Sequence, residues 1–202
     1  MKTRLRTPVR HGFSLIEVLI ALTITATLLT ATMSALDASF KGYKATSESA
    51  STQVVARIVM QRITAMVRTG EDFGPYPLNP ITTPNIQSDY IEFVSYRDPS
   101  ANTERITRLE RRETDDESGL FELWYVVTTM TNGEESSSDE APLLVGLQQL
   151  SFDMEYEVGP RLKRVTIDMI IDPDDLQDAQ IATRLETPTI RLVTSAAPRM
   201  NE

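Results

Sequence analysis

The first strong pattern in the chain is an apolar stretch from Phe13 to Leu36, whose only charged residue is Glu17. As a helix rising about 1.5 Å per residue, this stretch is roughly 36 Å long, enough to span the hydrocarbon core of a bilayer. Residues 1–12 hold four basic residues and no acidic one. Because positive charge stays on the cytoplasmic side, the pattern predicts a single-pass protein with a cytoplasmic N-terminus and an exported C-terminal part.

The predicted helix continues beyond the apolar stretch. No proline occurs in residues 9–74, so one helix can run from about Phe13 to Thr69 and end at Gly70. In its second half, residues 37–70, apolar residues recur at spacings of three and four, which predicts an amphipathic helix packed on a core. The predicted core-facing residues are Val54, Val55, Ile58, Val59, Ile63, Met66 and Val67.

After residue 70 the hydrophobic period changes to two, which predicts β-strands. In 150–158, apolar residues from Leu150 to Val158 alternate with polar ones, and 164–171 alternates in the same way. The Gly-Pro pair between these stretches predicts an antiparallel hairpin. Further strands are predicted at 90–96, 106–112, 120–129 and 189–195, with loops at the polar stretches 111–119, 131–140 and 172–180.

One long helix followed by a run of strands predicts an α+β fold. We expect the N-terminal helix, with a membrane half and an amphipathic half, to pack on an antiparallel β-sheet domain formed by residues 71–202. A length of 202 residues suits one small domain plus an anchor.

Composition narrows the function classes. The chain has no cysteine, and its single histidine is His11 in the basic stretch, so histidine-dependent nucleophilic catalysis and thiolate metal sites are disfavoured. Beyond residue 12 the chain carries 16 basic and 29 acidic residues, and no nucleic-acid partner is expected. The acids Asp153, Glu155 and Glu157 share one strand face, which is typical of a solvated sheet and not of a catalytic pair. We therefore expect a non-enzymatic protein.

Glu17 leaves three interpretations open for the N-terminus. A cleaved secretory signal normally has an apolar region of about 7–15 residues, shorter than this one, and no A-x-A triplet follows here. A plain membrane anchor explains everything except Glu17, because a carboxylate at the centre of a membrane helix costs about 2.5–3.5 kcal/mol. The third interpretation gives the carboxylate a role.

The stretch GFSLIE, residues 12–17, resembles the processing motif of type IV prepilins. In that family a prepilin peptidase cuts after the glycine and methylates the new amine. The resemblance implies that residues 1–12 are a basic leader cut between Gly12 and Phe13, that Phe13 is N-methylated, and that Glu17 pairs with a subunit's new N-terminal amine during assembly. It implies residues 13–36 as the membrane and polymerisation half of the helix, anchored in the inner membrane, with a periplasmic C-terminal domain.

Within the prepilin-like proteins, the tryptophan-bearing stretch 120–127 followed by 141–157 resembles the J-type minor pseudopilin of type II secretion. The K type usually lacks the glutamate, so Glu17 argues against it. The resemblance implies a minor pseudopilin that supports export of folded proteins and contacts other pseudopilin or pilin subunits. The alternatives are a minor pilin of a type IV pilus, used in adhesion, motility or DNA uptake, and a non-polymerising membrane-anchored periplasmic domain.

Two further features carry weaker predictions. Asp172, Asp174 and Asp175, with Asp178, offer oxygen ligands that calcium accepts, but the spacing lacks the glycine and final glutamate of an EF-hand. A solvated acidic loop is favoured, so no cofactor is expected beyond this weak calcium candidate. Trp124 and Tyr125 are both predicted to lie in the core.

Overall fold

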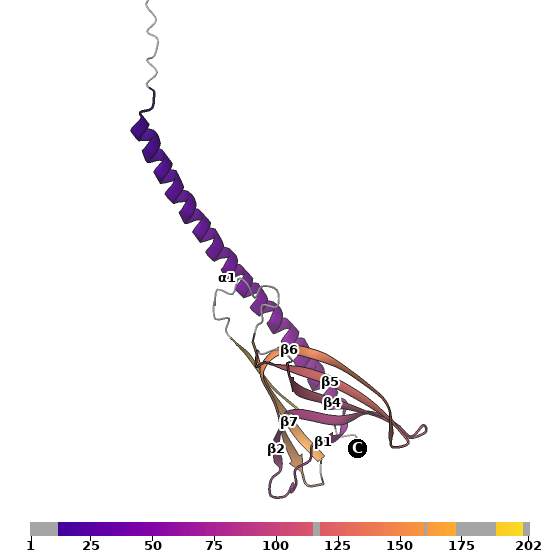
Figure 1. Cartoon of the computed structure of the whole chain (residues 1–202). Coiled ribbons are helices and arrows are strands. Elements are labelled where there is room, and N and C mark those ends of the chain that lie inside the picture. The colour runs from indigo at the N-terminus through magenta and orange to yellow at the C-terminus, as the bar shows by residue number, and fades with distance from the viewer. Residues whose placement is uncertain (1–11, 115–117, 160, 173–188, 200–202) are drawn as a thin grey trace, which may run out of the picture. The chain divides into compact units, whose positions relative to one another are not determined.

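The structure is a computed structural model that describes residues 12–114, 118–159, 161–172 and 189–199. It contains the helix α1 (Leu15–Thr69) followed by strands of one antiparallel sheet (Figure 1). Contacts divide the chain into two compact units, Met1–Thr46 and Ser47–Glu202. The α+β class predicted from the sequence is confirmed, with the C-terminal part of α1 packed on the sheet.

The helix begins two residues later than predicted and ends at the predicted residue. Its last turn closes with a hydrogen bond from the Gly70 N–H to the Met66 carbonyl, 2.9 Å long. Gly70 itself is required by packing, because a Cβ there would lie 2.5 Å from Cδ2 of Phe93. The glycine therefore lets the chain leave the helix directly against β3 (Tyr90–Asp98).

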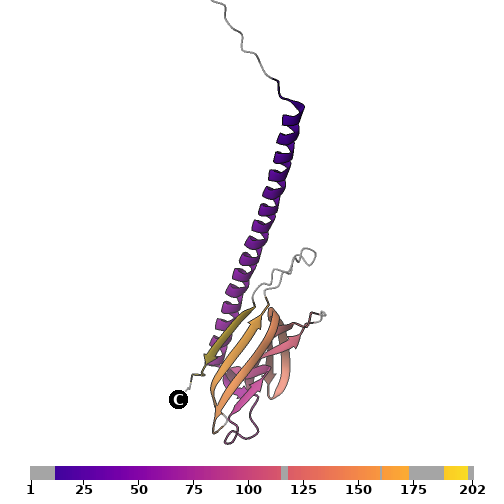
Figure 2. The same ribbon diagram turned by 90° about the vertical axis from the view of Figure 1, so that its left-hand side faces the viewer.

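The sheet order is β1-β3-β4-β5-β6-β7-β8, and β2 pairs separately with β6. All of these pairs are antiparallel. Figure 2 shows β7 and β8 side by side at one end of this order. The strands not yet bounded are β1 (Glu71–Gly74), β2 (Asn85–Ser88), β4 (Thr103–Glu113), β5 (Phe121–Thr131), β6 (Glu134–Glu157), β7 (Arg161–Ile171) and β8 (Ile190–Ala196).

Strand β6 organises the sheet because it changes partner along its 24 residues. Its first part pairs with β5 up to Leu147, and its second part pairs with β7 from Leu147 onward. Gly146, with φ of 74°, and the neighbouring register shifts lie at the change of partner. A bulge of this kind bends a strand and increases its twist, which lets one strand serve both parts of the sheet.

The predicted hairpin of 150–158 with 164–171 is confirmed by the pairing of β6 with β7. The predicted loop at 131–140 is wrong, because β6 already begins at Glu134. Asn132 and Gly133 both have positive φ, 56° and 80°, and form a two-residue turn. Asn-Gly is the strongest short hairpin signal, and it overrides the polar character of the residues that follow.

The core lies between one face of α1 and the sheet. Ala56, Ile63 and Val67 are fully buried, whereas Val54, Val55 and Ile58 are 58, 47 and 59% exposed, so the prediction was wrong for these three. The buried stripe is narrower than the apolar pattern, because the helix has more apolar positions than the sheet covers. The sheet residues in the core are Phe73, Ile91, Phe93, Leu109, Leu123, Leu144, Leu147, Leu150, Phe152, Met154, Tyr156, Leu162, Val165, Ile167, Met169, Ile171 and Ala196.

Val158 was predicted to continue the apolar face that begins at Leu150, and it is 74% exposed. Strand β6 ends one residue earlier, at Glu157, so the alternation of faces no longer applies to Val158.

The difference between buried and exposed isoleucines on α1 predicts two matched variants. Ile63→Ala should lower the free energy of unfolding by about 2–5 kcal/mol, because it leaves a cavity against the sheet. Ile58→Ala should change it by less than about 0.5 kcal/mol. Chemical denaturation of the full chain in detergent measures both, and equal losses for the two variants would contradict the placement of the buried face.

Candidate functional site

Gly12 and Phe13 lie just before the first helical residue, in a non-helical segment. Both are exposed, and the Phe13 side chain is 87% exposed. A Cβ built on Gly12 meets no described atom within 4 Å. Positive φ angles occur at other glycines, such as Gly119 and Gly133, and Gly12 is not among them. Among the described atoms, nothing near Gly12 excludes a side chain at this position.

Ser14 and Glu17 form a capping box at the start of α1. The Ser14 N–H and the Ser14 hydroxyl donate to Glu17 Oε2 at 2.8 and 2.9 Å, and the Glu17 N–H donates to Ser14 Oγ at 3.3 Å. This reciprocal bonding satisfies two helix-terminal N–H groups that have no partner within the helix. Both side-chain bonds reach Oε2, and no described residue donates to Oε1. Sequence analysis missed Ser14, although S-x-x-E before an apolar run is a known helix-start signal.

The first part of α1 is long and apolar enough to cross a bilayer once. It contains an 18-residue window with a mean hydropathy of 2.0, none of it buried in the structure. The first charged residues after the apolar stretch are Asp37 and Lys41, which pair across one helical turn at 2.8 Å. Charge therefore begins just where the predicted membrane half ends, at Leu36.

Five threonines lie on this part of the helix, and the structure shows where their hydroxyl groups bond. Each hydroxyl donates to a backbone carbonyl three or four residues earlier. This bonding satisfies the polar hydrogens within the helix, which makes threonine tolerable in an apolar environment. The residues are Thr23, Thr25, Thr27, Thr30 and Thr32.

The family model of the prokaryotic N-terminal methylation motif matches residues 8–33. The chain carries this motif. It includes Gly12, Phe13, Ser14 and Glu17, together with the first turns of α1. No curated protein and no solved structure matches the chain significantly.

The motif is that of prepilin-type proteins, which include type IV pilins and pseudopilins, and it supports a prepilin-type subunit of either kind. The motif implies processing by prepilin peptidase and assembly with other subunits. The structure and the motif together fit a single N-terminal membrane anchor followed by a folded domain.

The calcium candidates lie largely outside the described residues, which include Asp172 but not Asp174, Asp175 or Asp178. Asp172 follows β7 and accepts a hydrogen bond from Gln148 Nε2 at 3.2 Å. Among the described residues there is no group of three acidic or histidine side chains that could hold a metal ion.

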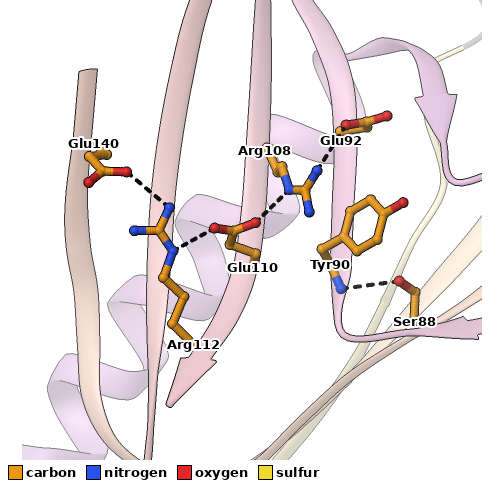
Figure 3. Close-up of polar contacts among 7 residues, drawn as sticks. All are labelled: Ser88, Tyr90, Glu92, Arg108, Glu110, Arg112 and Glu140. Carbon is orange, nitrogen blue, oxygen red and sulfur yellow. Dashed lines mark hydrogen bonds and ion pairs between the residues drawn. The ribbon is translucent and has the colours of Figure 1, made fainter. Parts of the chain in front are cut away.

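A second polar feature crosses the sheet face opposite the helix (Figure 3). We call it the arginine ladder, formed by Glu92, Arg108, Glu110, Arg112 and Glu140. At its centre Glu110 accepts hydrogen bonds from Arg108 Nε at 2.5 Å and Arg112 Nε at 2.6 Å. The outer contacts join Arg108 to Glu92 at 3.7 Å and Arg112 to Glu140 at 2.9 Å. Acids and arginines thus alternate across this sheet face.

Trp124 and Tyr125 lie on opposite faces of β5, and Trp124 contacts the arginine ladder. The Arg112 guanidinium lies 4.5 Å from the ring centroid of Trp124, which is half-buried on the ladder side of β5. Tyr125 faces the other way, packs against the core and contacts Arg62 of α1. The prediction that both lie in the core was therefore wrong for Trp124, because adjacent strand residues point to opposite faces.

Glu110 should make the folded unit sensitive to acid. Burial alone would raise the pKa of Glu110, but hydrogen bonds from Arg112 and Arg108 outweigh it and hold the pKa below the ordinary value of 4.5. A carboxyl group whose pKa is lowered by folding stabilises the protein above its unfolded pKa. That stabilisation is lost as pH falls through the folded pKa.

We therefore expect Glu110→Gln to lower the free energy of unfolding near pH 7 by about 1 kcal/mol. The loss of stability between about pH 5 and pH 3 should be smaller in the variant than in the wild type. Denaturation of the full chain in detergent over a pH series measures both effects. Glu134→Gln, at the exposed start of β6, is the control. An acid profile for Glu110→Gln identical to the wild type would contradict the role of the ladder.

Proposed function

We propose that this chain is a minor pseudopilin of a type II secretion pseudopilus, a filament or tip subunit that supports export of folded proteins. The observation that carries the proposal is the exposed Gly12–Phe13 bond, followed within one turn by Glu17 at the head of an apolar helix. The match to the methylation motif over residues 8–33 supports the prepilin-type class. The successive strands β5 and β6, which carry the stretches that resemble the J type, support the finer assignment.

In this proposal the chain has four parts. Residues 1–12 are a leader removed by prepilin peptidase, 13–36 are the membrane and polymerisation half of the helix, 37–70 the amphipathic half, and 71–202 the periplasmic β domain. The protein sits in the inner membrane with its N-terminus cytoplasmic before processing. Its partners are the peptidase and other pseudopilin subunits.

Glu17 is the residue that couples processing to assembly. Removal of the leader creates an amine at Phe13, and methylation leaves it basic. A carboxylate within a membrane needs a partner, and a nearby cation offsets the desolvation of both groups. The Oε1 atom accepts no bond from the described residues, so it can receive the amine of a neighbouring subunit while Oε2 stays bonded to Ser14.

The cleavage site predicts the effect of a single glycine substitution. Gly12→Val should abolish leader removal, because the side chain would stand between the backbone and the peptidase, whereas the chain itself has room for it. Gly42→Val is the matched control, since its Cβ also meets no described atom within 4 Å. Intact mass of protein from native membranes is the measurement.

We expect the wild type and the Gly42→Val control to begin at Phe13 with one added methyl group, and Gly12→Val to keep residues 1–12. A wild-type chain that still carries residues 1–12, or is cut beyond Leu36, would overturn the prepilin assignment.

The assembly role of Glu17 predicts a separate outcome. Glu17→Ala should insert into the membrane normally and lose co-purification with its partner subunits at least tenfold, because the neighbour's amine has no counter-ion. Asp37→Ala, which removes an exposed carboxylate paired with Lys41, is the control and should co-purify normally. Unchanged co-purification of Glu17→Ala would favour a non-polymerising anchored domain.

Cross-linking in cells distinguishes a subunit of a type II secretion pseudopilus from a subunit of a type IV pilus. A pseudopilin cross-links to type II secretion components, and deletion of its gene stops export of folded proteins. A minor pilin of a type IV pilus would instead cross-link to pilus subunits, and its deletion would impair adhesion, motility or DNA uptake.

A further inference from the structure

Three hydrogen bonds join Ser14 and Glu17 at the start of α1. They fix the residue at which the helix begins, because Ser14 occupies the N-cap position and Glu17 the third helical position. The Val18 N–H then makes the first helical bond to the Ser14 carbonyl, 3.2 Å long. Gly12 and Phe13 consequently stay outside the helix.

The position of this boundary matters for cleavage. A peptide bond inside a helix has its polar groups bonded along the axis and is surrounded by side chains, so it cannot enter a peptidase cleft. Proteolysis concentrates in exposed, irregular segments. The Gly12–Phe13 bond lies two residues before Leu15, and the side chain of Phe13 is 87% exposed.

We propose that Ser14 is a positioning residue for leader removal, which acts through Glu17 to stop the helix and present the Gly12–Phe13 bond to the peptidase. This inference rests on the proposed prepilin function. It gives Glu17 two separable roles. The hydrogen-bonding role at Ser14 needs only an acceptor atom, and the assembly role needs a negative charge.

The two roles predict different responses to matched substitutions. Alanine has no side-chain acceptor, so the helix start is no longer fixed at Ser14 and can shift towards Phe13 and Gly12, whereas threonine and asparagine cap well. We expect Ser14→Ala to slow leader removal roughly threefold to tenfold, and Ser14→Thr and Ser14→Asn to process at about the wild-type rate. Glutamine replaces glutamate in capping boxes, so Glu17→Gln should also process at about the wild-type rate while losing assembly.

The experiment is a pulse-chase measurement of leader removal from the full-length chain in cells that express the prepilin peptidase. Membrane insertion of each variant is checked by protease protection, and thermal unfolding reports the sheet unit. Membrane insertion and the thermal unfolding of the sheet unit should be unchanged in every variant, because Ser14 and Glu17 are exposed and lie outside the unit that begins at Ser47.

Each outcome bears on the inference. Slow processing of Ser14→Ala together with rescue by Ser14→Asn supports capping. Slow processing of both overturns it and indicates recognition of the hydroxyl group itself, and wild-type rates for Ser14→Ala also overturn it. A wild-type chain that is not cut at Gly12 overturns the prepilin function along with the inference. Normal processing of the wild type with a failed capping prediction overturns the inference alone.

Discussion

Burial of one narrow face of α1 against the sheet is the interaction on which the folded unit depends. Ala56, Ile63 and Val67 are fully buried, and β6 changes partner from β5 to β7 near Gly146. The helix end must also approach β3 closely, which Gly70 permits. Because the sheet covers only this face, Val54, Val55 and Ile58 keep much of their surface exposed. The packing of α1 on the sheet therefore determines which apolar residues of the helix are buried and which stay exposed.

The N-terminal part of the same helix is predicted to lie in a lipid bilayer and not in water. In a bilayer every backbone and hydroxyl hydrogen needs an internal partner. The carbonyl groups of the helix accept hydrogen bonds from all five threonine hydroxyls before Leu36. Glu17 is the exception, since a hydrogen bond does not remove a charge. Its location in the first turn of α1, within the stretch that matches the methylation motif, distinguishes this helix from a plain membrane anchor.

Sequence patterns predicted most of this architecture, and the errors have specific physical causes. Six strands and the β6–β7 hairpin follow from alternation alone, because a sheet with one wet face imposes a period of two. The start of β6 was missed because polar residues on both faces of a strand hide that period, although the Asn132-Gly133 turn was visible. The exposed isoleucine at Ile58 could not be foreseen, because how much of a helix a sheet covers depends on tertiary packing. The prediction placed Trp124 in the core, whereas its indole ring is covered by the Arg112 guanidinium on the other face of the sheet.

Glu110 and Glu17 are held by different kinds of hydrogen-bond donor. Glu110 is held between two arginines of its own strand, so its charge is neutralised where it lies. Glu17 is held by an N–H and a hydroxyl, which are neutral donors, and the sequence contains no basic residue from Gly12 to Leu36. A charge in a low-dielectric medium that is bonded only to neutral donors remains uncompensated. In the proposed function, the compensating cation is the amine that cleavage after Gly12 would create, either in the same chain or in a neighbouring subunit.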